Sequence, residues 1–360
     1  MWLLPPVPNC TPCLAQSPNT CLVNKMRKLA TVRKIDVIAA IEGADSIETA
    51  VLGGWKVVVK KGEFAVGDLA VYIEIDSWVP NELAAFLSKG KEPREYLGVK
   101  GERLRTVKLR GQLSQGLLLP IREVMSRWDD SYEGADLTEM LGIQKWEPPV
   151  NAQLAGVVKG NFPSQIPKTD QERVQNLKDT IEACAKAGTT FEITEKLEGS
   201  SMTCYLLDGE FGVCSRNMDL KRDENNSFWK VAFVQNIEEK MRDRGLDNIA
   251  IQGELIGPGI QGNIYNLSFL DFYVYDVYDV QTGKYMNPVA RRALVSDLGL
   301  KHVPLLGTEA TVSSVDAILA LAEGNSILYS KQEREGIVFK ENNGGVTFKA
   351  ISNKYLLKQR

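Results

Sequence analysis

The second half of the chain is organised around the stretch FEITEKLEGSSM, residues 191–202. The segment from Phe191 reads as a strand that ends at Lys196. Gly199, Ser200 and Ser201 follow, and such a turn lets a phosphate approach the backbone closely. The stretch therefore predicts a strand followed directly by a turn suited to phosphate.

A hairpin follows this turn. Two strand-like runs, 203–207 and 210–215, are joined by Asp208-Gly209, the strongest short-range hairpin signal. Counting back from the turn pairs Leu207 with Glu210 and Ser201 with Arg216. Arg216 is therefore expected beside the loop that follows Lys196, where a lysine, a glycine-serine turn and an arginine would converge at one end of a sheet.

Three later segments extend the expected sheets. A strand-like run over 248–255 contains Gly253-Glu254, and residues 269–280 (FLDFYVYDVYDV) predict an aromatic-rich strand. A second hairpin joins 335–340 to 346–349. With a five-residue loop, Lys349 would lie opposite Ile337, on the same face as Glu335.

The first half of the chain has a different pattern. Short strand-like runs with glycine turns lie at 56–60, 69–75, 104–109 and 116–121. They favour a small OB-type β-barrel, although the pattern alone does not separate it from an SH3-like barrel. Residues 144–170 carry four prolines and predict a linker, and 171–186 predict a helix.

The expected fold class is therefore α+β, with two separable units. The expected divisions are a disordered extension over 1–25, an OB-type domain over 26–143, a linker over 144–170, and a domain of antiparallel sheets and helices over 171–360.

Composition narrows the chemistry. The 360 residues carry a net charge of −3 and a single histidine, His302, so a Ser-His-Asp triad or multi-histidine metal site is not expected. No apolar run approaches the ~20 residues that cross a bilayer. Cys184, Cys204 and Cys214 lie in apolar segments and are expected to be reduced core residues of a cytoplasmic protein.

These motifs together resemble a known superfamily. Lys196-Leu-Glu-Gly199 is similar to motif I of the covalent nucleotidyltransferases, which include DNA ligases, RNA ligases and mRNA capping enzymes. Residues 272–277 resemble motif III, 335–340 motif IV, and the surroundings of Lys349 motif V. The N-terminal β domain and the segment FPSQIPKTDQERVQN, residues 162–176, add a resemblance to the Deinococcus-type RNA ligases.

The resemblance implies roles for individual residues. Lys196 would be linked covalently to AMP from ATP, with Glu335 and Lys349 as further catalytic residues. Magnesium or manganese would be held by Glu198 and Glu335, in part through water. The residues implied in nucleotide binding are Glu195 at the adenine edge, Gly199, Arg216 and Glu254 near the ribose, Tyr275 or its neighbour Tyr273 stacked on adenine, and Lys340.

The proposed nucleophile must lose a proton before it attacks the α-phosphate of ATP. Lys349 and a divalent metal are expected to lower the pKa of Lys196 by like-charge repulsion. Two departures from the family pattern stand out. Glu198 replaces the more usual aspartate or histidine, and motif V lacks its second lysine, for which Lys354 or Lys358 would substitute.

The implied activity is that of an ATP-dependent RNA ligase that seals 3′-hydroxyl/5′-phosphate nicks. The substrate would be a nicked duplex with RNA on the 3′-hydroxyl side, and the enzyme a monomer that binds no membrane. The alternatives are an ATP-dependent DNA ligase and a non-catalytic protein that binds nucleic-acid ends. The basic residues expected to contact the duplex phosphates are Arg27, Lys28, Arg33, Lys34, Lys100, Arg103, Arg105, Lys108 and Arg110.

Overall fold

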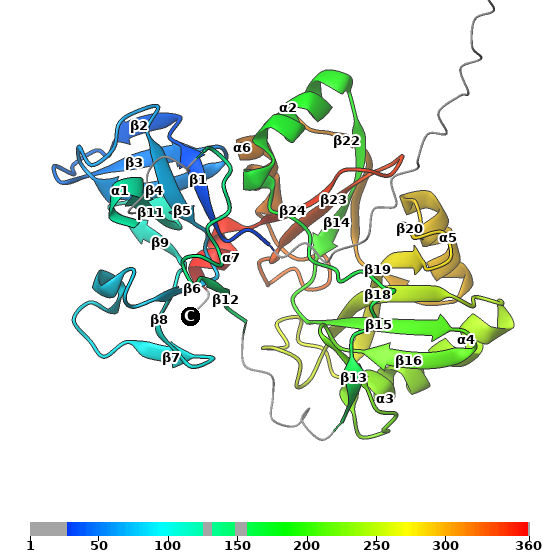
Figure 1. The fold of residues 1–360 in the computed structure, drawn as a ribbon. Helices are drawn as coiled ribbons and strands as arrows, with labels where there is room; N and C mark the ends of the chain where they lie inside the picture. Colours follow the sequence, from blue (N-terminus) through cyan, green and yellow to red (C-terminus); the bar gives the residue numbers. More distant parts are fainter. Residues whose placement is uncertain (1–26, 125–131, 148–156, 359–360) are drawn as a thin grey trace, which may run out of the picture.

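The computed structural model describes residues 27–124, 132–147 and 157–358. In these residues the chain forms two β-rich domains that lie side by side (Figure 1). The extension expected over residues 1–25 lies outside the described residues. No helix in the described part of the chain is long and apolar enough to span a membrane.

The N-terminal domain is a barrel-like set of short antiparallel sheets, in strand orders β1-β5-β11, β2-β3-β4, β9-β10 and β12-β6-β8-β7. Strand β4 alternates buried and outward-facing residues, as its sequence predicts. The elements are β1 (Ala30–Lys34), β2 (Val37–Ala40), β3 (Ile47–Leu52), β4 (Trp55–Lys60), β5 (Leu69–Ile73), β6 (Ser77–Pro80), a 3₁₀ turn (Ala85–Ser88), β7 (Arg94–Tyr96), β8 (Val99–Arg103), β9 (Thr106–Leu109), β10 (Gln112–Gln115), β11 (Leu117–Pro120), α1 (Ile121–Val124) and β12 (Gln144–Lys145).

The second domain has two sheets, with strand orders β13-β17-β16-β15-β18-β19-β20, in which β21 also pairs with β19, and β22-β14-β23-β24. Its strands are β13 (Val158–Asn161), β14 (Thr190–Lys196), β15 (Ser200–Leu207), β16 (Glu210–Cys214), β17 (Met218–Leu220), β18 (Ile249–Ile256), β19 (Asp271–Asp279), β20 (Lys284–Tyr285), β21 (Lys301–His302), β22 (Leu305–Thr311), β23 (Gly336–Glu341) and β24 (Thr347–Ile351). Its helices are α2 (Lys178–Ala187), α3 (Ser227–Val234), α4 (Ile237–Asp243), α5 (Pro288–Asp297), α6 (Val315–Ala322) and α7 (Asn353–Lys358). The α+β expectation is confirmed.

The turn after Lys196 carries the chain from one sheet to the other. Lys196 is the last residue of β14 in the smaller sheet, and Ser200 begins β15 in the larger sheet. Each sheet has its own apolar cluster, one packed with α3, α4 and α5 and the other with α2 and α6. The end of β14 therefore lies where the two sheets meet.

The two expected hairpins differ in outcome. The Asp208-Gly209 turn forms with both residues at positive φ, and Leu207 pairs with Glu210 as predicted. In the second hairpin the register prediction is wrong, because Lys349 pairs with Val338 rather than Ile337. The backbone of Glu341 already bonds Val346, so the connecting loop has four residues and the pairing moves by one.

The helix expected over 171–186 begins later. A 3₁₀ turn, Val174–Asn176, precedes α2. The residues before it are extended because the amide of Lys349 donates to the carbonyl of Glu172. The expected linker, residues 144–170, also supplies one strand to each domain, since β12 pairs with β6 and β13 with β17.

The domains share an apolar cluster. Ile351 and Leu356, at the C-terminal end of the chain, pack among OB-domain residues that include Trp55 and Tyr72. Helix α7 lies between β24 and the OB domain (Figure 1). Leu356 is only 5% exposed, so the last helix of the second domain completes the core of the first.

Candidate active site

Lys196 lies at the junction of the two sheets. It pairs through its backbone with Gly336 of β23, which places Glu335 beside it. The Lys196 Nζ atom lies 2.7 Å from Glu335 Oε1. The pairing of these strands therefore accounts for the contact between residues 139 positions apart in the sequence.

Two further carboxylates surround this pair. Gly199 donates its backbone N–H to the carboxylate of Glu254. A Cβ atom at Gly199 would lie 2.4 Å from the carbonyl oxygen of Leu255, so only glycine fits in this turn. Burial raises the pKa of Glu254 to about 8 against the opposing effect of Lys196. Burial also raises the pKa of Glu198, and the charge of Glu335 adds to this.

The pKa of Lys196 runs against the sequence-based expectation. Burial alone would lower this pKa, but the carboxylates of Glu335 and Glu254 raise it above the ordinary lysine value. Arg216 lowers it, although not enough to reverse the sign. The expectation of a lowered pKa is therefore wrong for the enzyme without ATP and metal, in which Lys196 carries its proton.

Lys349 belongs to a cluster of cations that meet around one acid, Asp170. Lys349 Nζ lies 3.0 Å from Asp170 Oδ1, and Lys145 Nζ lies 2.6 Å from Asp170 Oδ2. Arg216 also pairs with Asp170, at 3.7 Å. These cations hold the pKa of Asp170 well below its usual range despite its burial. Burial lowers the pKa of Lys349 to about 7, and Asp170 opposes this.

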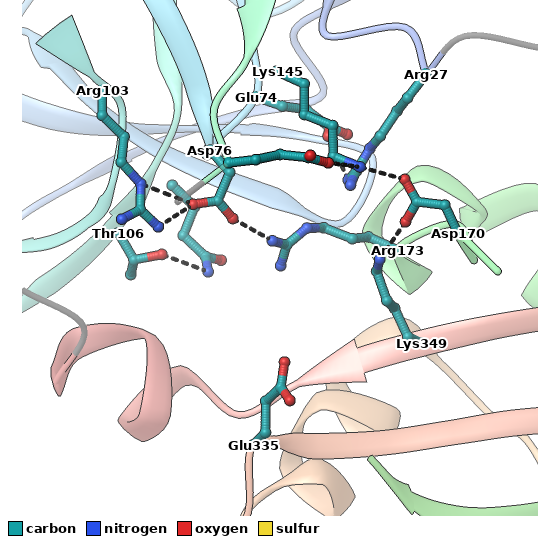
Figure 2. A network of polar contacts seen from close by, with 12 residues as sticks. Arg27, Glu74, Asp76, Arg103, Thr106, Lys145, Asp170, Arg173, Glu335 and Lys349 are labelled. Atoms are coloured by element: carbon teal, nitrogen blue, oxygen red, sulfur yellow. Dashed lines mark hydrogen bonds and ion pairs between the residues drawn. The ribbon is translucent and has the colours of Figure 1, made fainter. Parts of the chain in front are cut away.

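The OB domain adds two anchored arginines to this region (Figure 2). Arg27 Nη2 lies 2.6 Å from Glu74 of the OB domain. Asp76 binds Arg103 at 2.5 Å and Arg173 at 2.9 Å, and so ties both domains together. Burial alone would raise the pKa of Asp76, but Arg173 and Arg103 lower it.

Four members of this network were not assigned roles in nucleotide binding from the sequence. These residues are Glu74, Asp76, Asp170 and Arg173. The sequence feature that could have pointed to two of them is the segment 162–176, which carries Asp170 and Arg173 and shares the family resemblance. Lys354 is exposed and Lys358 pairs with Glu333 at 2.7 Å. The cations beside Lys349 are instead Lys145, Arg216, Arg27 and Arg173.

The residues expected around the base lie on both sheets. Glu195 accepts the amide N–H of Ile327 at 2.8 Å with Oε2, while its buried Oε1 atom has no partner. The hydroxyl of Tyr275 lies 3.0 Å from the Ser201 hydroxyl. Lys340, by contrast, is buried against Asp276 at 2.7 Å, and burial lowers its pKa to about 8.

Tyr273 differs from Tyr275 in its surroundings. Its ring lies 5.5 Å from the Lys301 ammonium group, and its backbone pairs with Glu254. Both tyrosines pack in the apolar cluster around Leu197. The structure therefore brings both candidate stacking rings to the same side of the motif I turn.

The three carboxylates beside Lys196 suit a divalent cation held partly through water. Among the residues that the structure describes, no three acidic, histidine or cysteine side chains are close enough to chelate a metal. Glu198, Glu254 and Glu335 nevertheless interact electrostatically, and the charge of Glu335 raises the pKa of the other two. Hard oxygen ligands and retained waters are the preference of Mg²⁺.

The basic residues of the OB domain fall into two groups. Arg27, Arg33 and Arg103 are engaged inside the protein, where Arg33 donates to Asn176 at 2.6 Å. Arg103 also stacks on Trp146, with 3.6 Å from its guanidinium carbon to the ring centroid. The exposed members are Lys28, Lys34, Lys100, Lys108 and Arg110. Arg105 is partly exposed.

Comparisons with known proteins agree with this architecture. The family model for RNA ligases matches residues 189–351, and an OB-fold domain model matches residues 29–121. No curated protein matches the chain. Mutants of Naegleria gruberi RNA ligase solved with ATP and manganese, and with AMP and manganese, are each 45% identical to the chain. Each match has a TM-score of 0.87 and covers 92% of this chain and 99% of that chain.

The same ligase solved with pyrophosphate gives a TM-score of 0.87 at 45% identity, over the same 92% of this chain and 99% of that chain. The similarity thus extends over both domains and includes the motifs around Lys196. The chain belongs to the RNA ligase family.

Proposed function

We propose that this ATP-dependent RNA ligase seals nicks between a 3′-hydroxyl and a 5′-phosphate, with Lys196 as the residue that carries AMP. The observation that supports this most directly is the position of Lys196. Its amine lies among three carboxylates on one side, Glu198, Glu254 and Glu335, and interacts electrostatically with Lys349, around which cations from both domains gather. ATP and a divalent metal are the cofactors of the reaction.

In the first step, Lys196 Nζ attacks the α-phosphorus of ATP. An N–P bond forms, the P–O bond to the β-phosphate breaks, and pyrophosphate leaves. Glu335 Oε1, at 2.7 Å from Nζ, is an acceptor for the ammonium proton. Lys349, Lys145 and Arg173 supply positive charge for the leaving group.

Roles for the residues around the base and the ribose can be proposed from their positions in the site. The unpartnered Oε1 of Glu195 would accept from the 6-amino group of adenine. Tyr275 would stack on the base, with Tyr273 as the alternative, and Arg216 and Glu254 would approach the ribose. Lys340, bound to Asp276, would shape the floor of the site rather than touch the nucleotide.

Glu198 and Glu335 would hold the divalent metal, which neutralises phosphate charge when it is bound. The negative charge of nearby carboxylates keeps Lys196 protonated, and a bound metal would neutralise part of that charge. The pKa of Lys196 would therefore fall when ATP and the metal bind, because less negative charge would remain to stabilise the ammonium form.

The second and third steps use RNA. AMP passes from Lys196 to the 5′-phosphate end, and the 3′-hydroxyl then attacks that phosphate and releases AMP. The exposed basic residues of the OB domain would hold the duplex. We infer a need for RNA on the 3′-hydroxyl side, since a 2′-hydroxyl distinguishes RNA from DNA. We also propose a cytoplasmic monomer, with domain divisions near residues 143 and 171.

The test uses labelled ATP with the full chain and its Lys196→Ala variant. The unaltered chain should give a protein-bound label that survives denaturation, and the variant should give none. The variant should still seal a nick that already carries AMP, because that step does not use the amine as nucleophile. An adduct of normal yield in Lys196→Ala would remove the central claim.

Specificity needs four nicked duplexes, with RNA or DNA on each side of the break and one common template. Sealing should be fast only with RNA on the 3′-hydroxyl side. Equal rates on an all-DNA nick would favour the DNA ligase alternative.

A further inference from the structure

The carboxylate proposed to read adenine, Glu195, is held by the loop that joins helix α6 to strand β23. The amide N–H of Ile327, in this loop, donates to Glu195 Oε2 at 2.8 Å, while the buried Oε1 atom has no partner. Binding groups are kept in a productive geometry by hydrogen bonds from the residues behind them. The position of the Ile327 amide therefore decides where Oε1 points.

The α6–β23 loop is closed on itself. An antiparallel bridge joins its two arms at Asn325 and Glu333. The amide of Ser326 donates to the carbonyl oxygen of Gln332 at 2.8 Å, and Ser326 is only 3% exposed. Ile327 follows directly, so the place of its amide depends on how firmly the arms of the loop are held.

Arg334 fastens the base of this loop to helix α6. Its amide donates to the Gly324 carbonyl at 3.0 Å. Its guanidinium donates to three carbonyls at the C-terminal end of the helix, those of Leu321 at 3.1 Å, Ala322 at 3.2 Å and Glu323 at 2.5 Å. The last carbonyls of a helix have no partner within it, and the planar fork of arginine can reach several of them at once. An added Cβ at Gly324 would lie 2.9 Å from Arg334 Nη2, so the guanidinium rests directly against the backbone.

Helix α6 is a firm support for this attachment. Leu319 and Ala322 are buried in the apolar cluster of the smaller sheet. On its other side, Arg334 directly precedes Glu335, whose carboxylate lies 2.7 Å from Lys196 Nζ. Arg334 therefore anchors the loop to the helix at the point where the chain enters the active site.

The same contacts bear on the charge of Glu195. Burial raises the pKa of this carboxyl. The hydrogen bonds from Ser326 and Ile327 lower it, and so does the charge of Arg334. An ionised carboxylate only accepts hydrogen bonds, which suits the 6-amino group of adenine.

We propose that Arg334 is a positioning residue for nucleotide specificity, which locks the α6–β23 loop to helix α6, holds the Ile327 amide on Glu195 and so aims Oε1 at the 6-amino group of adenine. Arg334 itself does not touch the nucleotide. The inference rests on the proposed function, since it takes Glu195 as the residue at the adenine edge.

The test compares ATP with purine ribonucleoside triphosphate, which lacks the 6-amino group. Adduct formation by the full chain is measured in single turnovers with each labelled nucleotide, and the ratio of the two kcat/KM values reports the contact with that group. Arg334→Lys keeps the positive charge but loses the fork. The preference for ATP should fall about fivefold in this variant, because a misdirected acceptor loses part of a hydrogen bond to a charged group.

Two further variants accompany it. The matched control is Arg244→Lys, because Arg244 also donates to a carbonyl at the end of a helix, that of Asp297 in α5, at 3.3 Å. This change should leave the ratio unaltered. Ser326→Ala loosens the loop independently, since the Ser326 hydroxyl accepts from the Leu328 amide at 3.1 Å. It should lower the ratio about twofold.

The ratio separates positioning from a general structural role. Displacement of Glu335 or loss of folded protein slows adduct formation from both nucleotides equally, so an unchanged ratio in Arg334→Lys would overturn the proposal. If that variant does not fold, an unchanged ratio in Ser326→Ala overturns it instead. Equal use of both nucleotides by the unaltered chain would also overturn it, while the protein-bound label would still support Lys196 as the carrier of AMP. Failure of the proposed function would appear as the absence of label from either nucleotide.

Discussion

Glu195 offers the nucleotide one buried acceptor atom. Its Oε2 atom is already used by the Ile327 amide, and the Ser326 side chain also bonds this carboxylate, while Oε1 has no partner. In Glu195→Gln the amide oxygen should keep the Ile327 bond, which places the NH₂ group at the Oε1 position. A donor there opposes the 6-amino group of adenine and suits the 6-oxo group of guanine.

We therefore expect Glu195→Gln to lower kcat/KM for adduct formation with ATP by about tenfold or more, given ~1.5–3 kcal/mol for a hydrogen bond to a charged group. The ratio of kcat/KM for ATP to kcat/KM for GTP should fall by a larger factor, because the new donor also favours guanine. The measurement is single-turnover labelling with each nucleotide. An unchanged ATP-to-GTP ratio would show that Oε1 does not face the base.

Asp170 raises the pKa of Lys349, and the pKa values of Lys349 and Lys196 together predict how the rate of adduct formation depends on pH. The value of kcat/KM reports groups of the free enzyme. Lys196 must be neutral, and its pKa lies above the ordinary lysine value, whereas Lys349 must be charged and has a pKa of about 7. Below pH 7 the rate should rise about tenfold per pH unit with the neutral fraction of Lys196. Above pH 7 the loss of charge on Lys349 should cancel this rise, giving a plateau.

Asp170 raises the pKa of Lys349, so Asp170→Asn lowers that pKa further and should move the bend to lower pH. Asp316→Asn is the control, because Asp316 pairs with Lys56 at 3.3 Å on the surface. A bend that stays in place in Asp170→Asn would mean that another group sets it.

At the residue scale the sequence predicted the neighbours of Lys196 better than their electrostatics. Glu335 was expected to share the catalytic site with Lys196, and its carboxylate lies 2.7 Å from the lysine amine. The sign of the lysine pKa shift was not obtained, because it depends on the number of carboxylates that folding gathers around the amine. Tyr265 was missed for a related reason. Its hydroxyl accepts from the Glu198 amide across 67 positions of sequence, and no local pattern records such a contact.

Strand β23 lies between the lysine strand β14 and the last strand β24, and its pairing with β24 requires one close backbone approach. A Cβ atom on Gly336 would lie 2.2 Å from the carbonyl oxygen of Ala350. Gly336→Ala should push β24 away from β23, displacing Glu335 and Lys349 together. We expect a loss of about 1–3 kcal/mol of stability, and an adduct rate reduced by more than tenfold through displacement of catalytic groups.

Gly307, in β22 of the same sheet, provides the matched control. Its nearest neighbour to an added Cβ is 4.0 Å away, so Gly307→Ala should leave both quantities close to those of the unaltered chain. Thermal unfolding and labelled-ATP assays measure the two effects. Equal behaviour of the two variants would show that the β23–β24 spacing is not critical.

Elements were predictable where local chemistry decides them. The Asp208-Gly209 turn sets its own register, which counting back from the turn reproduces. The second hairpin has the longer connection Asn342-Asn-Gly-Gly345, and its true length differed by one residue from the expected length. The start of α2 was misplaced because the residues around Arg173 bond to β24 and the OB domain instead of forming a helical turn.

At the scale of the whole molecule, the two domains complete one another. The proline-rich segment predicts two separable units, but the last β-strand and the last helix carry Ile351 and Leu356 into the core of the OB domain. Arg27 and Lys145 bring positive charge from the N-terminal part of the chain to the region of Lys349. The sequence could place the strands within each domain, but it could not show that the C-terminal helix belongs physically to the first.

This arrangement changes what is expected of the isolated second domain. The four motifs named in the sequence, I, III, IV and V, lie within residues 160–360, which on sequence grounds predicts that this fragment still forms the adduct. The structure predicts a loss, because the fragment lacks Lys145 and Arg27, leaves Arg173 without Asp76, and exposes Ile351 and Leu356 to water.

We expect the fragment to form the adduct at least a hundredfold more slowly than the full chain, since two or more charge-assisted contacts at ~1.5–3 kcal/mol each are lost. It should also unfold at a lower temperature, as exposure of the two apolar side chains removes ~1.5–3 kcal/mol for each. Adding back residues 26–147 as a separate chain should restore part of the rate if the interface reforms. The measurement is the initial rate of protein-bound label from ATP, compared at equal concentrations of folded protein. A fragment as fast as the full chain would show that the nucleotide site needs neither the cations nor the docking surface of the OB domain.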